Sequence, residues 1–291
     1  MSHFTVLAAI LLLFTVSTVS ASDPALDLGD HLFALKNYDV AITEYKRFLF
    51  FNPNHSQASE AQFKIGLAYR AQEWWAEAVD VMIAAVQSTT ETELQAERRV
   101  ELAVTLIASG AYNLALIELI KVEMQSQSTQ LRHRARFLRG VAYLYQFKWE
   151  RARVVFQAYF DGIPGAAESA AEIDTLFLAA LNQPRKSEKA ARLLSTLLPG
   201  LGQAYAEDWT SGLNALLLNG VLGYVTLNAA INRDYDDVLL SFSFLFYRYY
   251  AGNRHRAAQT AQAFNERENR RYVDRIVQAL ETQFTAGKDR K

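Results

Sequence analysis

Four short segments, Tyr38–Ala41 (YDVA), Trp75–Ala78 (WAEA), Tyr112–Ala115 (YNLA) and Trp149–Ala152 (WERA), decide the fold of this chain. Each begins with an aromatic residue and ends in alanine, and neighbouring segments lie 37 residues apart. A small residue stands twelve positions before each alanine, and a large apolar residue stands four positions after it. In chain order these are Gly29, Gly66, Ala103 and Gly140, and then Tyr45, Met82, Leu119 and Phe156. Columns held in register over four copies predict an internal repeat.

The spacing predicts that each copy is a pair of helices joined by a short turn. The small residue lets the first helix approach the second closely, and the aromatic residue opens the second helix and packs back on the first. Pro53 and Pro164 each follow a repeat alanine by twelve positions, and they end the second helix because proline cannot continue the hydrogen-bond ladder. The predicted repeats cover 22–58, 59–95, 96–132 and 133–165, followed by a degenerate capping pair at 166–198.

This pattern resembles the tetratricopeptide repeat, a helix pair of 34 residues, and each copy here is three residues longer. The resemblance covers about half of the chain and implies an all-α, right-handed superhelix whose groove is lined by the first helix of each pair. The groove residues that it implies are Phe33, Phe63, Leu67, Arg70, Val104, Arg134, Phe137, Val141 and Tyr145. Such a groove is largely apolar and suits a helix or an extended peptide with apolar anchors. The alternative is that some of these side chains belong to the core between repeats.

A second module begins at Pro199 with the sequence PGLGQAYAEDW. Its P-G-x-G-Q-x-Y motif resembles bacterial membrane modules such as the TM2-like domains, which carry no established activity. The motif residues are Pro199, Gly200, Gly202, Gln203 and Tyr205. A phosphate-binding role for this glycine turn is disfavoured, because Glu207 and Asp208 already meet the dipole of the following helix and repel an anion.

The motif is followed by Trp209–Ile231, a run of 23 mostly apolar residues without a formal charge. As a helix it is about 34 Å long, enough to cross the apolar core of a bilayer. Asn214 and Asn219 suit a membrane helix that packs against another, since amides bond across such pairs. The stretch Tyr235–Ala251 predicts the second helix, with Arg248 reaching from a tyrosine cluster toward lipid phosphates. We therefore expect an apolar helical hairpin over 199–252, with the core of a soluble domain as the alternative.

The two ends of the chain bear on its location. Residues 1–21 read as a signal peptide that is cut after Ala21, with an uncleaved anchor as the alternative. This predicts exported, periplasmic repeats associated with the inner membrane. The basic flanks of the hairpin favour the cytoplasm instead, so the hairpin either spans the inner membrane against this bias or only dips into the outer surface of that membrane. The tail, 253–291, is expected to be a basic amphipathic helix that docks on the repeats and frays at its end, with a free helix lying on the membrane as the alternative.

The composition argues against catalysis. The chain has 291 residues, no cysteine, five isolated histidines and a formal net charge of −1, so it has no thiolate site and no global basic field for nucleic acid. Known catalytic motifs such as H-E-x-x-H are missing from it. We expect no enzyme and no cofactor or metal, but a scaffold of the bacterial cell envelope that binds a protein or peptide partner and membrane lipid. The alternatives are a soluble periplasmic binding module and an integral component of an envelope assembly, insertion or transport machine. The oligomeric state is left open.

Overall fold

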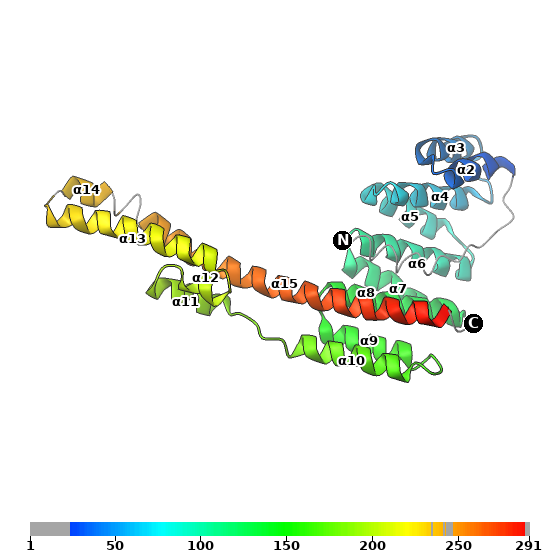
Figure 1. Cartoon of the computed structure of the whole chain (residues 1–291). Coiled ribbons are helices and arrows are strands. Elements are labelled where there is room, and N and C mark those ends of the chain that lie inside the picture. The colour runs from blue at the N-terminus through cyan, green and yellow to red at the C-terminus, as the bar shows by residue number, and fades with distance from the viewer. Residues whose placement is uncertain (1–23, 234, 241, 243–246, 289–291) are drawn as a thin grey trace. The chain divides into compact units, whose positions relative to one another are not determined.

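The computed structural model describes residues 24–233, 235–240, 242 and 247–288 (Figure 1). These residues form helices and turns, and no strand occurs among them, so the predicted all-α class is confirmed. The predicted signal peptide, 1–21, lies outside the described residues. The chain divides into two compact units: a first unit of Met1–Leu181 with Ile276–Lys291, and a second unit of Asn182–Arg275.

Consecutive helices of the first unit pack against one another. They are α2 (Pro24–Ala34), α3 (Tyr38–Phe51), α4 (Ala58–Ala71), α5 (Trp75–Ser88), α6 (Thr92–Ala108), α7 (Tyr112–Gln125), α8 (Thr129–Tyr145), α9 (Trp149–Phe160) and α10 (Ala167–Leu181). From α2 to α10 each helix contacts the next in the chain, and α6 also contacts α8. The helices α3, α5, α7 and α9 begin at the four repeat aromatics, which confirms the predicted start of the second helix in every copy.

The turn inside each helix pair has the same backbone conformation in all four copies. Its left-handed residues are Lys36, Glu73, Gly110 and Phe147, again 37 positions apart. The amide that follows each of them reaches back to a carbonyl five residues earlier, as in Asn37 to Leu32. This is the double hydrogen-bond pattern that commonly closes a helix with a left-handed residue, usually glycine. Three of the four positions are not glycine, so composition alone did not reveal this turn.

The small and the large repeat columns pack on each other across the helix pair. A Cβ added to Gly140 would lie 2.8 Å from Cε2 of Phe156, and one added to Gly66 would lie 2.5 Å from Cγ of Met82. The large partners are fully buried. The two columns lie sixteen residues apart because the paired helices approach closely where these residues meet. A larger side chain in the small column would push the two helices apart.

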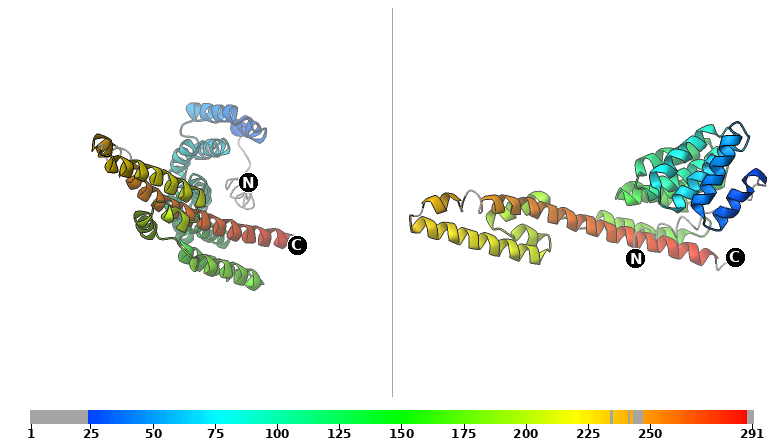
Figure 2. Two further views of the ribbon diagram at one scale, coloured as in Figure 1. Left: turned by 60° about the vertical axis from the view of Figure 1, so that its left-hand side comes forward. Right: turned by 90° about the horizontal axis from the view of Figure 1, so that it is seen from above.

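The second unit contains α11 (Glu188–Leu197), α12 (Leu201–Tyr205), α13 (Trp209–Ile231), α14 (Tyr235–Leu240) and most of α15 (Tyr247–Lys288). In this unit α11 contacts α12, α12 contacts α13, and α13 contacts α14. The helix α13 and the first part of α15 run alongside one another in every view (Figure 2).

The structure differs from two predicted boundaries. The capping pair at 166–198 is divided, because α10 belongs to the first unit whereas α11 packs on the motif that follows it through Ala191. The helix has no break at the predicted boundary 252/253, since α15 is one helix of 42 residues that passes through Gly252. A single glycine costs an exposed helix only about 1 kcal/mol and does not break it.

The predicted docking of the tail on the repeats is confirmed for the end of α15. Ile276 and Leu280 are completely buried there. Gln283 accepts a hydrogen bond from the Ser169 hydroxyl and donates one to the Glu172 carboxylate at 3.3 Å, both on α10. This end of the helix therefore covers the last helix of the array.

Candidate functional site

The predicted groove residues do not form one accessible apolar surface. Phe137 and Val141 are 0% exposed and Val104 is 5% exposed, so their assignment to a groove is wrong. The reason is that α6 contacts α5, α7 and α8, and α8 contacts α6, α7 and α9, which turns the inner positions of both helices into core. Half-buried members of the predicted set remain on α2, α4 and α8, namely Phe33, Phe63, Leu67, Arg70 and Tyr145.

The two predicted groove cations, Arg70 and Arg134, are paired with one carboxylate. Nη1 of Arg70 lies 2.8 Å from Oε2 of Glu101, and Nη2 of Arg134 lies 2.6 Å from Oε1 of the same residue. Burial raises the pKa of Glu101, but the two guanidinium groups outweigh it and hold this pKa below its ordinary value. Both arginines that were assigned to the groove are therefore bound to Glu101.

A second set of ion pairs extends this arrangement across α2, α4 and α6. Asp30 binds Lys64 at 2.6 Å, and Glu60 binds the almost fully buried Arg98 at 2.6 Å. The Arg98 guanidinium also lies over the ring of Phe63, 5.4 Å from its centroid. We call Asp30, Lys64, Glu60, Arg98, Arg70, Glu101 and Arg134 the ion-pair ladder. Its members come from α2, α4, α6 and α8, so ion pairs as well as apolar packing hold together the first helices of successive pairs.

The glycines of the P-G-x-G-Q-x-Y motif make a tight junction between helices. Gly200 has φ +99°, and a Cβ there would collide with the carbonyl oxygen of Gly212 on α13. A Cβ on Gly202 would collide with the carbonyl oxygen of Ala191 on α11. Glycine is required at both positions because backbone approaches backbone without room for a side chain.

The polar members of the motif tie the same helices together. The Gly202 amide donates to Oγ of Ser195 at 3.0 Å, and this hydroxyl donates to Oε1 of Gln203 at 3.0 Å. Nε2 of Gln203, which is buried, donates to Oδ1 of Asn253 on α15 at 2.5 Å. Tyr205 accepts a hydrogen bond from the Ser187 amide at 3.1 Å. Ser195 and Asn253 were missed in the sequence, because nothing in their spacing marks them as partners of the motif.

The helix α13 presents its apolar side chains on its surface. Among the described residues it is the one helix long and apolar enough to cross a membrane. Its exposed large side chains are Trp209, Leu213, Leu216, Leu217, Leu218, Val221, Tyr224, Val225, Leu227 and Ile231. The alternative of a buried soluble core does not describe this helix. At its start, the Asp208 carboxylate accepts a hydrogen bond from the Ser211 amide at 3.0 Å, as expected for an acidic residue at a helix N-terminus.

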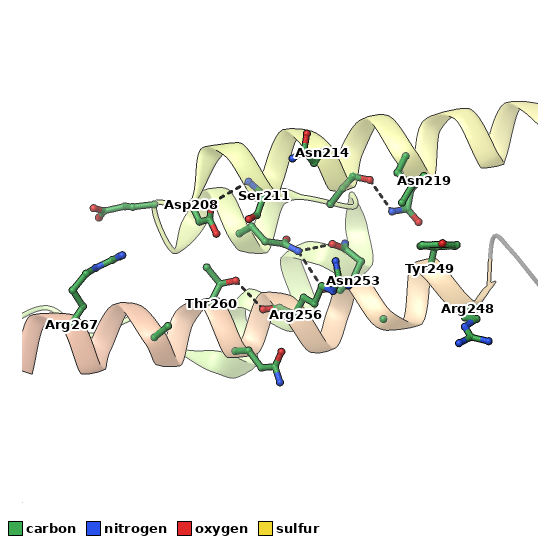
Figure 3. Close-up of a pocket in the computed structure, with 17 residues that line it drawn as sticks. Asp208, Ser211, Asn214, Asn219, Arg248, Tyr249, Asn253, Arg256, Thr260 and Arg267 are labelled. Carbon is green, nitrogen blue, oxygen red and sulfur yellow. Dashed lines mark hydrogen bonds between the residues drawn. The ribbon is translucent and has the colours of Figure 1, made fainter.

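An open cleft of about 1020 Å³ lies between α13 and α15 in the second unit (Figure 3). Both helices contribute polar residues to it, including the predicted Asn214, Asn219 and Arg248. Among the described residues, the two asparagines form no hydrogen bond across to a second helix. Asn219 instead donates to the carbonyl of Ala215 on its own helix at 2.8 Å, and Asn214 is exposed.

Comparisons with known proteins add no assignment. No protein-family model matches this sequence, and no curated protein matches it. Within the described ranges, no group of three histidine or acidic residues is placed to hold a metal ion.

Proposed function

We propose that this protein is a non-enzymatic scaffold of the bacterial cell envelope, with tetratricopeptide-like repeats that bind a partner protein and α13 as its membrane tether. In this proposal the repeats form a right-handed superhelix, are exported to the periplasm and are held at the inner membrane. The tether works by keeping the partner of the repeats close to the bilayer.

The observation that carries the proposal is the exposed apolar surface of α13. Ten of its large side chains are between 39% and 72% exposed. Moving them into lipid is worth about 10 kcal/mol, at about 1 kcal/mol for each half-exposed side chain. A single myristoyl chain, worth about 5.5 kcal/mol, gives only reversible binding. This surface is therefore sufficient for a stable anchor, whether α13 spans the bilayer or lies in its interface.

The tether is tested by extracting bacterial membranes with alkaline carbonate. The wild-type chain should stay in the pellet, and Leu217→Glu with Val221→Glu should release it, because two charges then face lipid. Leu114→Glu with Ile117→Glu is the matched control, since these α7 side chains are 53% and 50% exposed but lie in the first unit. Release of the wild-type chain would favour the soluble periplasmic module.

Topology is tested in the same cells by protease treatment of spheroplasts. Cleavage of the repeats from outside, with a C-terminal fragment left in the membrane, is the expected result. Protected repeats would contradict export and would place the partner in the cytoplasm, as the basic flanks of the hairpin favour.

Partner binding is expected on the surface beside the ion-pair ladder, where Phe63 and Leu67 are half-buried one turn apart on α4. A photo-crosslinking residue in place of Leu67 should give one adduct of defined mass in living cells, and the same residue at Leu114 on α7 should give none. Phe63→Ala with Leu67→Ala should lower partner recovery about tenfold through the loss of anchor contacts. Adducts from Leu114 alone would overturn this assignment. Phe137 is unsuitable for the test, because truncating a buried phenylalanine costs about 3–5 kcal/mol of stability.

A further inference from the structure

The cleft of the second unit has two ends of different character. The helices α13 and α15 are antiparallel there, so Asp208 lies toward the end of the cleft that Arg267 borders and Asn219 lies near Tyr249 (Figure 3). Both acidic residues at the first end are already engaged. Asp208 caps α13, and Glu207 pairs with Lys186 at 3.1 Å. The two carboxylates of this end therefore already have partners, whereas two buried amide atoms elsewhere along the cleft do not.

Two buried asparagines that line the cleft each have one amide atom without a hydrogen-bond partner among the described residues. Asn219 and Asn253 are each only 5% exposed, and both line the cleft. Within the part of the chain that the structure describes, Oδ1 of Asn219 accepts no hydrogen bond and Nδ2 of Asn253 donates none. A buried polar atom without a partner costs about 1–3 kcal/mol, so one free acceptor and one free donor beside a cleft mark a place for a polar ligand.

Cationic side chains also line the cleft. Along α15, Arg248 lies more than one turn before Asn253 and Arg256 lies just under one turn after it, and both are exposed. Among the side chains that the structure describes, neither forms an ion pair. Their guanidinium groups are suited to bind phosphate oxygens.

The cleft is continuous with the apolar surface of α13. Leu218 lines the cleft and is 44% exposed, and Leu217 and Val221 beside it are 58% and 60% exposed. A ligand held by its polar group in the cleft would thus place an attached hydrocarbon chain along α13. Free phosphate would use the polar end alone.

From this arrangement we propose that the cleft binds the phosphate-bearing headgroup of an anionic phospholipid. Arg248 and Arg256 bind the phosphate, Nδ2 of Asn253 donates to it, and Oδ1 of Asn219 accepts a hydrogen bond from a headgroup hydroxyl. The acyl chains lie against α13. This inference rests on the membrane tether proposed above and adds the class of lipid that the tether selects.

The test uses the full-length protein and two kinds of vesicle, one of phosphatidylcholine alone and one of phosphatidylcholine and phosphatidylglycerol in equimolar amounts. The protein is floated with each, then extracted in mild detergent and weighed by native mass spectrometry. We expect flotation with both vesicles, and one phosphatidylglycerol retained on the protein. Arg248→Gln with Arg256→Gln should reduce the retained lipid at least about tenfold, the loss expected for one charge-assisted hydrogen bond.

The matched control is Arg254→Gln with Arg270→Gln, which removes the same charge from exposed positions of α15 outside the cleft. It should retain lipid as the wild type does. Asn219→Leu is a second, milder variant that should also lose the lipid, since it removes the free acceptor and keeps a residue suited to helix.

The outcomes separate the two proposals. No flotation with either vesicle overturns the tether. Flotation without retained phosphatidylglycerol, or equal loss in the cleft and control variants, overturns the headgroup site alone. Release of the retained lipid by inorganic phosphate would support the phosphate contacts, whereas binding of inorganic phosphate with no lipid retained would overturn the assignment to lipid.

Discussion

Replacing Gly200 with alanine is expected to destabilise the junction between α11, α12 and α13 by about 3 kcal/mol or more. Its φ of +99° is strained for any residue with a Cβ, and the added atom would collide with the Gly212 carbonyl. The turn and α13 cannot make room for this atom without separating α12 from α13. Hydrogen exchange of the full-length protein in detergent should show lost protection in α12 and at the start of α13.

Gly220→Ala is the control for this prediction. Gly220 lies in the middle of α13, and a Cβ there meets nothing within 4 Å. Alanine should therefore strengthen the helix by up to about 1 kcal/mol. Equal protection in the Gly200 and Gly220 variants would show that the motif does not close the junction as described.

Glu101→Ala should destabilise the first unit by about 3 kcal/mol. Glu101 is 18% exposed at its side chain and binds both Arg70 and Arg134, so its removal leaves two largely buried guanidinium groups without a carboxylate. The loss should appear as faster hydrogen exchange in α6 and α8 of the full-length protein. Unchanged exchange in α8 would contradict the bridging role of Glu101.

Replacing Glu97, one turn earlier on α6, is expected to have the opposite effect on stability. Burial, with Glu91 and Glu93 nearby, raises the pKa of its carboxyl group. Its ionised form is therefore unfavourable in the folded state, and Glu97→Gln should slow exchange at neutral pH. Glu101→Gln should instead accelerate exchange in α6. The two variants thus carry the same type of substitution in the same helix and are expected to give opposite results.

The two glutamates also differ in the sign of their pH dependence. The pKa of Glu101 is lowered in the folded state, so its contribution is complete above the ordinary value of 4.5 and is lost as the pH falls through the lowered value. The pKa of Glu97 is raised, so its penalty disappears as the pH falls through a value above 4.5. The gain from Glu97→Gln should therefore vanish at a higher pH than the loss from Glu101→Gln.

The repeat shows how far local pattern determines this structure. The aromatic of each copy opens a helix because it packs on the partner helix at a fixed separation, and all four starts were predictable from Ala41 and its equivalents. The left-handed turn before it was not predictable at Lys36, Glu73 or Phe147. A non-glycine residue adopts that conformation only because the packed helix pair on either side holds it there.

The candidate sites show the limit of a resemblance carried over by position. It placed Phe137 and Arg134 in an apolar groove, whereas one is core and the other is bound to Glu101. Which side of a helix is covered depends on the number of helices around it, and α6 and α8 have neighbours that a single repeat does not reveal. Similarly, Gln203 belongs to a visible motif, but its partner Asn253 lies fifty residues away on another helix.

By itself, the sequence determined the all-α class, the periodic helix pairs, the apolar run of α13 and the glycines of the junction. These follow from spacing and from the sterics of short segments, which act within a few turns of helix. Only the tertiary structure decided which charges pair along the ladder, which predicted groove residues are core, and which polar atoms remain unsatisfied in the cleft. Those outcomes depend on burial and on partners distant in the chain, because the free energy of a polar group is set by what surrounds it.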